Sequence, residues 1–405
     1  MTGSILETSN LAAWVAHLAG SGTVVIAPVR AGPGRTDYRP IQRLDEAVLQ
    51  GPLPRRSLKE FFLPPSEVLL RYRRQKDGVE LEEVPTAFGP RVILGARPCD
   101  AAGLEILDEV MGWDHVDELW FGRRRATTIV SVACPVADGS CFCSALGPGP
   151  GSTRGADVLL VPLPAGPGSQ QSADVLEEAV DRFLVDAEPF AGASTAAGER
   201  APSLPARYLA RPVTPRGEQL LDGLGGAPAD PADVEDAARF VETAGLKVGR
   251  TTAALGLGRQ GDQAAGLSRL SEWLGDSYDH PLWQSLALRC HGCGACAAVC
   301  PTCHCFDIVD EHDAHDRGAR RRNWDTCQSS KFTRHASGHN PRATQTERLR
   351  QRWMHKFHIY PRRFGVVSCT GCGRCVRACA AGTSVVEILG RMAALAGCGA
   401  AGGDR

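Results

Sequence analysis

The sequence predicts an α/β domain over residues 1–165 and an all-helical domain over residues 241–405. Short runs rich in β-branched residues recur in the first part, amphipathic helical patterns dominate the last part, and an Ala-, Pro- and Gly-rich segment lies between them. With 405 residues and 43% hydrophobic side chains, the chain is long enough for two or three folded domains.

Four apolar runs in the first part are predicted to be buried strands: 23–29, 91–97, 127–133 and 157–163. Between the second and third runs, Leu104, Leu107 and Met111 recur at helical spacing. Strand, helix and strand therefore alternate, which is typical of an α/β domain.

The rest of the chain is expected to contain helices without strands. Residues 166–240 have little periodicity and are expected to form an irregular or helical linker region. Beyond them, three apolar stripes at helical spacing predict helices: Leu282 and Leu286; Leu349, Trp353, Met354 and Phe357; Val385, Val386, Leu389 and Met392.

Charge and cysteine content narrow the class of protein. A formal net charge of -1 gives no overall attraction to nucleic acid or anionic membranes. The N-terminus lacks the features of a secretory signal, and no apolar stretch is long enough to span a membrane, so we expect a cytoplasmic protein without membrane insertion. In that reducing compartment, 16 cysteines indicate metal or redox chemistry rather than disulfides.

Two cysteine motifs carry the strongest chemical signal. Residues 290–301 have the spacing C-x2-C-x2-C-x3-C-P, and residues 369–379 repeat it without the proline. In this spacing, three thiolates on a tight loop bind one [4Fe-4S] cluster, and the fourth reaches the other cluster. We therefore expect two clusters, one bound by Cys290, Cys293, Cys296 and Cys379, and the other by Cys369, Cys372, Cys375 and Cys300.

The glycines of both motifs fit this assignment, because loop amides that crowd around cluster sulfurs require residues that adopt positive φ. They are Gly292, Gly294, Gly371 and Gly373. Zinc is the alternative metal, but four-thiolate zinc sites usually consist of paired C-x2-C knuckles. The long insertion between the motifs carries helical patterns and favours a helical ferredoxin-like module.

The order of motifs resembles a known family. The resemblance is carried by FFLPPSEVLLRYR (61–73), ILGARPCDAAGLEIL (93–107), CFCSALGPGPG (141–151), CHGCGACAAVCPTCHCFDIVDE (290–311), NWDTCQSSKF (323–332), RLRQRWMHKFHIYP (348–361) and CTGCGRC (369–375). These runs are similar to the iron–sulfur beta subunit of cytosolic sulfhydrogenases, which are [NiFe]-hydrogenases, and to the corresponding iron–sulfur subunit of anaerobic sulfite reductases. The sequence departs from the family where Ala380 and Ala381 follow Cys379.

The resemblance implies a subunit of an oxidoreductase complex. Such a subunit passes electrons between a flavin-containing, NAD(P)H-oxidising partner and a catalytic partner that holds a nickel–iron centre or a sirohaem. A hydrogenase complex is the first expectation and a sulfite reductase complex the second. The sequence offers no nucleophile paired with a base and no paired-carboxylate site, so we expect no catalytic residue in this chain.

Eight cysteines remain outside the two motifs. Cys99, Cys134, Cys141 and Cys143 lie at the C-terminal ends of two predicted strands and in the following loop, where α/β domains gather functional groups, so either a third cluster or inert thiols are expected there. The other cysteines near the motifs are expected to tune a cluster through weak hydrogen bonds: Cys303, Cys305 and Cys327. We expect no role for Cys398.

The segment from Arg317 to Arg363 contains thirteen Arg or Lys residues. We expect Arg320, Arg321 and Arg322 to balance cluster charge or to contact an acidic partner subunit. The rival hypothesis is an iron–sulfur regulator that binds DNA through this segment, but no helix-turn-helix pattern supports it.

Overall fold

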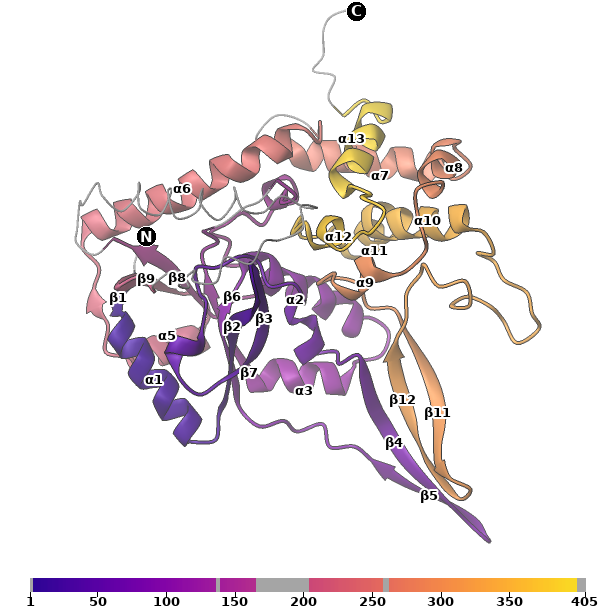
Figure 1. Ribbon diagram of the computed structural model, residues 1–405, viewed down its shortest axis with the longest axis horizontal. Coiled ribbons are helices and arrows are strands. Elements are labelled where there is room, and N and C mark those ends of the chain that lie inside the picture. The colour runs from indigo at the N-terminus through magenta and orange to yellow at the C-terminus, as the bar shows by residue number, and fades with distance from the viewer. Residues whose placement is uncertain (1–2, 136–138, 165–203, 258–261, 399–405) are drawn as a thin grey trace, which may run out of the picture. The chain divides into compact units, whose positions relative to one another are not determined.

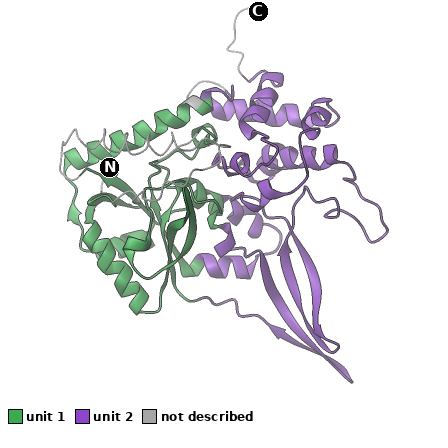
Figure 2. Cartoon of the chain, viewed as in Figure 1, with its two compact units in different colours: residues 1–58, 89–105, 125–252 green, residues 59–88, 106–124, 253–405 purple. Residues whose placement is uncertain are grey.

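The computed structural model describes residues 3–135, 139–164, 204–257 and 262–398 (Figure 1). The chain divides into two units, each assembled from separate stretches of sequence (Figure 2). Unit 1 comprises residues 1–58, 89–105 and 125–252, and unit 2 comprises residues 59–88, 106–124 and 253–405. These units differ from the contiguous ranges expected from the sequence. The expected linker, 166–240, lies partly outside the described residues, and its described part belongs to unit 1.

Unit 1 is built on a mixed sheet of eight strands. The strands are β1 (Ser4–Glu7), β2 (Val24–Gly32), β3 (Arg35–Ile41), β6 (Arg91–Ala96), β7 (Thr127–Val132), β8 (Val158–Leu163), β9 (Arg207–Pro212) and β10 (Ala227–Pro228). Their order is β10-β1-β9-β8-β7-β6-β2-β3. The pairs β2–β6, β6–β7 and β7–β8 are parallel, and the other pairs are antiparallel.

The predicted strands of the first domain are confirmed. All four become neighbours in the parallel part of the sheet, β2, β6, β7 and β8. Their nearly continuous apolar sequences are explained by burial on both faces, as parallel strands covered by helices require.

Helices cover both faces of this sheet (Figure 1). On one face, Leu11 of α1 (Thr8–Gly20) and Leu221 of α5 (Pro215–Asp222) pack in one core cluster with Leu94 of β6. On the other, Ala237 of α6 (Pro231–Ala253) packs with Leu159 of β8. The predicted helix after β6 is also confirmed, as α2 (Pro98–Met111), whose first half lies in unit 1. Short 3-10 turns occur at η1 (Leu44–Glu46) and η3 (Cys143–Ala145).

Unit 2 combines helices with an antiparallel sheet of order β11-β12-β4-β5. The strands are β4 (Ser66–Gln75), β5 (Gly78–Glu83), β11 (Phe306–Ala314) and β12 (Arg317–Trp324). The helices are η2 (Leu58–Phe61), α3 (Glu118–Ala126), α7 (Gln263–Asp276), α8 (Leu282–Ala287), α9 (Ala295–Ala298), α10 (Gln345–Met354), the π-helical turn η4 (His355–Ile359), α11 (Tyr360–Phe364), α12 (Arg374–Arg377) and α13 (Val385–Leu395). Three of them, α8, α10 and α13, confirm the predicted stripes.

The expectation of an all-helical C-terminal domain is wrong, because residues 306–324 form the hairpin β11–β12. Because helical patterns lie on both sides of these residues, the whole region was expected to be helical. The many charges of the hairpin are tolerated in strands because Arg320 pairs with Asp310 and Arg321 with Glu311 across the hairpin, at 2.8 and 2.9 Å. No helix among the described residues is long and apolar enough to cross a membrane.

Arg322 on β12 differs from its neighbours because it is buried. Its guanidinium lies between the carboxylates of Glu67 on β4 (2.7 Å) and Asp117, and its side chain is 6% exposed. Arg320 on the same strand is 49% exposed. The ion pairs of Arg322 therefore join three segments of unit 2 that are far apart in sequence.

We expect Arg322→Ala to lower the free energy of unfolding by about 3 kcal/mol, because it leaves Asp117 without its buried counter-charge, whereas Glu67 keeps its ion pair with Arg123 at 3.1 Å. The matched variant Arg320→Ala should cost less than about 1 kcal/mol, because its ion pair is exposed. Urea unfolding followed by circular dichroism under anaerobic conditions measures both. Equal losses in the two variants would contradict the structural role assigned to Arg322.

Candidate metal-binding site

The two cysteine motifs form loops of the same geometry in unit 2. In each loop, the second glycine adopts positive φ and begins a short helix: Gly294 (φ 74°) precedes α9, and Gly373 (φ 69°) precedes α12. The same backbone bond follows, from Ala297 N to Gly294 O (2.9 Å) and from Val376 N to Gly373 O (3.0 Å).

The predicted positive φ is confirmed at all four motif glycines, since Gly292 (67°) and Gly371 (64°) adopt it as well. Gly294 is required for a second reason. A Cβ atom there would lie 2.6 Å from Cγ2 of Thr326, closer than real Cβ contacts allow. The loop therefore packs directly on the segment that follows β12.

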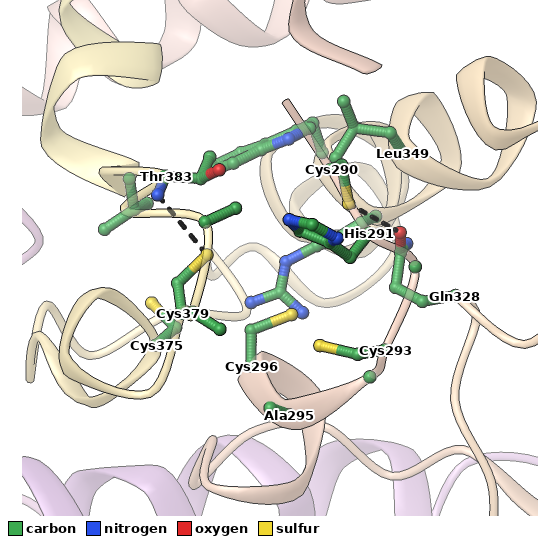
Figure 3. Close-up of a pocket in the computed structure, with 17 residues that line it drawn as sticks. Cys290, His291, Cys293, Ala295, Cys296, Gln328, Leu349, Cys375, Cys379 and Thr383 are labelled. Carbon is green, nitrogen blue, oxygen red and sulfur yellow. Dashed lines mark hydrogen bonds between the residues drawn. The ribbon is translucent and has the colours of Figure 1, made fainter. Parts of the chain in front are cut away.

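A pocket separates the two loops (Figure 3). Its lining includes Cys290, Cys293 and Cys296 from the first loop and Cys379 from the second. Figure 3 shows Cys293 and Cys296 on one side of the pocket and Cys375 and Cys379 on the other. The structure thus brings together the four cysteines expected to share one cluster, and Cys375 and His291 also reach this pocket.

Amide groups donate hydrogen bonds to the thiols of this pocket. Gln345 Nε2 donates to Cys290 Sγ at 3.3 Å and to Gln328 Oε1 at 2.9 Å. On the opposite side, the backbone N–H of Thr383 donates to Cys379 Sγ at 3.3 Å. Donors of this kind stabilise thiolates and tune the potential of a sulfur-ligated metal centre.

The second set of cysteines gathers around Cys300. Cys300 and Cys372 are buried, and the charge of Cys300 acts on both Cys369 and Cys375. Burial raises the pKa of the Cys369 thiol to about 11 and that of Cys375 to about 12. The expected partners of the second cluster therefore lie within electrostatic range of one another.

Three buried cations lie among these thiols. Lys356 Nζ contacts Cys300 Sγ at 3.5 Å and donates to Thr302 Oγ1 (3.0 Å) and Ser368 O (2.7 Å). Arg352 lines the pocket and points one nitrogen at Cys303 Sγ, at 4.0 Å. Lys59 donates to Cys303 O at 2.9 Å and lies over the Trp324 ring.

None of these three cations forms an ion pair with a carboxylate among the residues that the structure describes. Burial opposes the charge of Lys356, but the neighbouring Cys300 and Cys303 outweigh it and raise its pKa. Burial likewise opposes the charge of Arg352, and Cys296, Cys303, Cys375 and Cys300 together raise its pKa. Arg352 thus interacts with cysteines of both sets, whereas Lys356 lies against Cys300.

The basic residues near the thiols are not those expected from the sequence. Arg320, Arg321 and Arg322 pair with carboxylates of the sheet and of residue 117, so they are not available as counter-charges for the thiols. Sequence reasoning missed Arg352 and Lys356 because they were counted within a broad basic run. Their spacing of four residues, within a predicted helix that connects the motifs, was the signal that could have identified them.

The additional cysteines near the motifs form two thiol pairs. Cys300 and Cys303 interact, which lowers the pKa of Cys300 and raises that of Cys303. Cys305 and Cys327 interact at the open end of the β11–β12 hairpin, which raises the pKa of Cys305 and lowers that of Cys327. Gln328 Nε2 also lies 3.5 Å from Cys327 Sγ.

The remaining four cysteines singled out in the sequence lie in unit 1. Cys99 is in the first turn of α2, Cys134 follows β7, and Cys141 and Cys143 are buried in the next loop. Cys398 is buried in unit 2, where its thiol donates to Gly266 O at 3.2 Å.

The donor set of unit 2 suits iron–sulfur clusters. It consists of thiols on glycine-containing loops, N–H donors to sulfur and buried cations that offset thiolate charge. Among the described residues, no group of three or more Cys, His, Asp or Glu side chains is arranged closely enough to hold a metal ion.

Comparison with known proteins agrees with this chemistry. Residues 289–383 match a domain family described as "4Fe-4S dicluster domain". The chain is 26% identical over 331 residues to sulfhydrogenase 2 subunit beta of Pyrococcus furiosus, and the alignment covers 82% of this chain and 81% of that protein. No solved structure matches significantly. The resemblance inferred from the motifs is thereby confirmed: the chain is similar over most of its length to a sulfhydrogenase beta subunit, and a 4Fe-4S dicluster domain lies near its C-terminus.

Proposed function

We propose that this chain is an electron-transfer subunit that holds two [4Fe-4S] clusters within unit 2. The observation that carries the proposal is the shared pocket, in which thiols from both loops surround a space that Arg352 also lines. Cys290, Cys293, Cys296 and Cys379 would bind the first cluster, and Cys369, Cys372, Cys375 and Cys300 the second. The clusters supply reversible one-electron redox chemistry when bound.

The loop geometry supports crossed ligation. A short helix that contains the third cysteine of each motif carries the chain away from its own loop before the fourth cysteine. Cys379 accordingly lines the pocket of the first loop, and Cys300 interacts with Cys369 and Cys375. His291 and Cys375 also line the first pocket, but neither occupies the fourth position of a motif.

The chain's own residues would set the energetics of electron transfer. Each reduction adds a negative charge to a poorly solvated centre, and a nearby buried cation stabilises the reduced state. Arg352 interacts with cysteines of both sets, so it would favour reduction of either cluster. Lys356 would act mainly on the second.

The proposed setting is a cytoplasmic hydrogenase complex of the sulfhydrogenase type. The relative is named as the beta subunit of a sulfhydrogenase, which supports a place in a complex of several subunits here. The partners that the motif resemblance implies are a flavin subunit that oxidises NAD(P)H and a catalytic [NiFe] subunit. A sulfite reductase complex with a sirohaem subunit receives no such support. DNA binding is not favoured either, because Arg320, Arg321 and Arg322 are already paired with carboxylates.

Purification of the native complex tests the assignment to a hydrogenase. We expect the chain to co-purify from its native cell with partner subunits, and the complex to contain iron, nickel and flavin. Nickel should be present because the catalytic partner is proposed to be a [NiFe] subunit. Sirohaem in place of nickel would show that the chain belongs to a sulfite reductase complex. Recovery of the chain bound to DNA and without partner subunits would overturn the proposal.

The crossed ligation can be tested with four serine variants examined by EPR in the reduced state. Cys293→Ser and Cys372→Ser each damage the cluster of their own loop and provide reference spectra. We expect Cys300→Ser to resemble Cys372→Ser, and Cys379→Ser to resemble Cys293→Ser, because the fourth cysteine of each motif binds the opposite cluster. The reverse pairing of spectra would show that each motif binds its own cluster.

The buried cations can be tested by redox titration. Replacing Lys356 or Arg352 with Gln removes about 1–2 kcal/mol of stabilisation from a reduced cluster, which corresponds to a potential lower by about 50–100 mV. Arg350→Gln is the matched control on α10, because its guanidinium lies over Tyr278 and bonds to the Tyr278 carbonyl. Lys356→Gln should affect one cluster, and Arg352→Gln both. Unchanged potentials in both variants would refute the counter-charge role.

A further inference from the structure

The four cysteines of unit 1 lie on segments that the fold holds against one another. Strands β6 and β7 are parallel neighbours, with Leu94 opposite Val130 and Ala96 opposite Ser131. Their carboxyl ends therefore meet at the same edge of the sheet, which is where open α/β sheets place their functional groups. Cys99 follows β6 by three positions, and Cys134 follows β7 by two.

The loop that contains Cys141 and Cys143 returns to this edge. The backbone N–H of Cys134 donates to Pro150 O at 2.9 Å, which attaches the end of β7 to the far side of the loop. Cys141 and Cys143 are 8% and 9% exposed and pack with Val248 of α6.

The same loop also packs tightly on the helix that carries Cys99. At Gly155 (φ 73°), a Cβ atom would lie 2.1 Å from Ala101 O in the first turns of α2, so only glycine permits this approach. One turn further along α2, Glu105 Oε1 pairs with Arg154 at 2.8 Å. One contact therefore fixes the loop to the end of β7, and two fix it to the helix that follows β6.

We propose that Cys99, Cys134, Cys141 and Cys143 bind a third [4Fe-4S] cluster in unit 1. Four thiols match the ligand number of a cubane. The two loop cysteines have C-x-C spacing, which is shorter than the C-x2–4-C spacing of structural zinc sites. The N-terminus of the fourteen-residue helix α2 adds a positive potential at Cys99 that favours a bound anion. The buried carboxylate of Asp100 opposes this effect in part, and it accepts a hydrogen bond from the Tyr38 hydroxyl at 2.8 Å.

This site is separate from the dicluster domain, so it adds an electron carrier to a part of the chain that the domain match at 289–383 does not reach. The inference does not depend on the ligand assignment in unit 2. A failure of crossed ligation would leave it intact, and its own failure would leave the two clusters of unit 2 in place.

Iron content of the anaerobically reconstituted full chain tests the site. We expect about twelve irons in the wild-type protein and about eight in the double variant Cys141→Ser/Cys143→Ser. Cys398→Ser is the matched control, a buried cysteine of unit 2 outside any proposed site, and it should retain about twelve. Cys134→Ser should also fall to about eight, and its contact with Pro150 should survive because the backbone N–H makes it.

EPR of the reduced variants provides the second readout. The signals of the two clusters in unit 2 should persist in the double variant while one additional signal disappears. About eight irons in the wild-type protein, zinc bound in place of the third set of irons, or an unchanged iron content in both variants would each overturn the proposal.

Discussion

Uncompensated positive charge in the interior of unit 2 is the constraint on which the cysteine site depends. Arg352 and Lys356 are 7% and 5% exposed, and the described part of the chain offers neither of them a carboxylate partner. Lys59 is 3% exposed, and burial lowers its pKa. An isolated buried cation costs far more free energy than a folded protein can usually lose. The nearest sources of negative charge are the thiols of the two motifs. Thiolates at these positions would therefore stabilise the cations, and the cations would stabilise the thiolates.

Local chemistry made the motif loops predictable from the sequence. The cysteine spacing and the glycines at 292, 294, 371 and 373 together specify a tight loop with positive φ, and the structure has that loop twice. The parallel strands β2, β6, β7 and β8 were equally predictable, because burial on both faces requires continuous apolar runs. In each case a requirement that acts over a few residues determines the structure.

Features that depend on distant pairing were not predictable. The hairpin β11–β12 consists largely of charged residues, and its stability comes from partners across the strands and from β4, a strand more than two hundred positions earlier. The same pairing explains why a role of Arg320, Arg321 and Arg322 as counter-charges for the thiols was not supported by the structure. A single sequence shows the positive charges of these residues, but it does not show that Asp310, Glu311 and Glu67 already neutralise them.

The helical segment between the motifs contains a π-helical turn that carries one of the residues of the site. Pro361 has no N–H, and within a regular α-helix its ring would clash with the carbonyl group four residues earlier. The chain avoids this clash by widening into the π-helical turn His355–Ile359 immediately before α11. Lys356 lies in that turn, and Arg352 lies in the α-helix before it. The two cations share Cys300 and Cys303 as neighbours, and Arg352 also acts on Cys296 of the first loop.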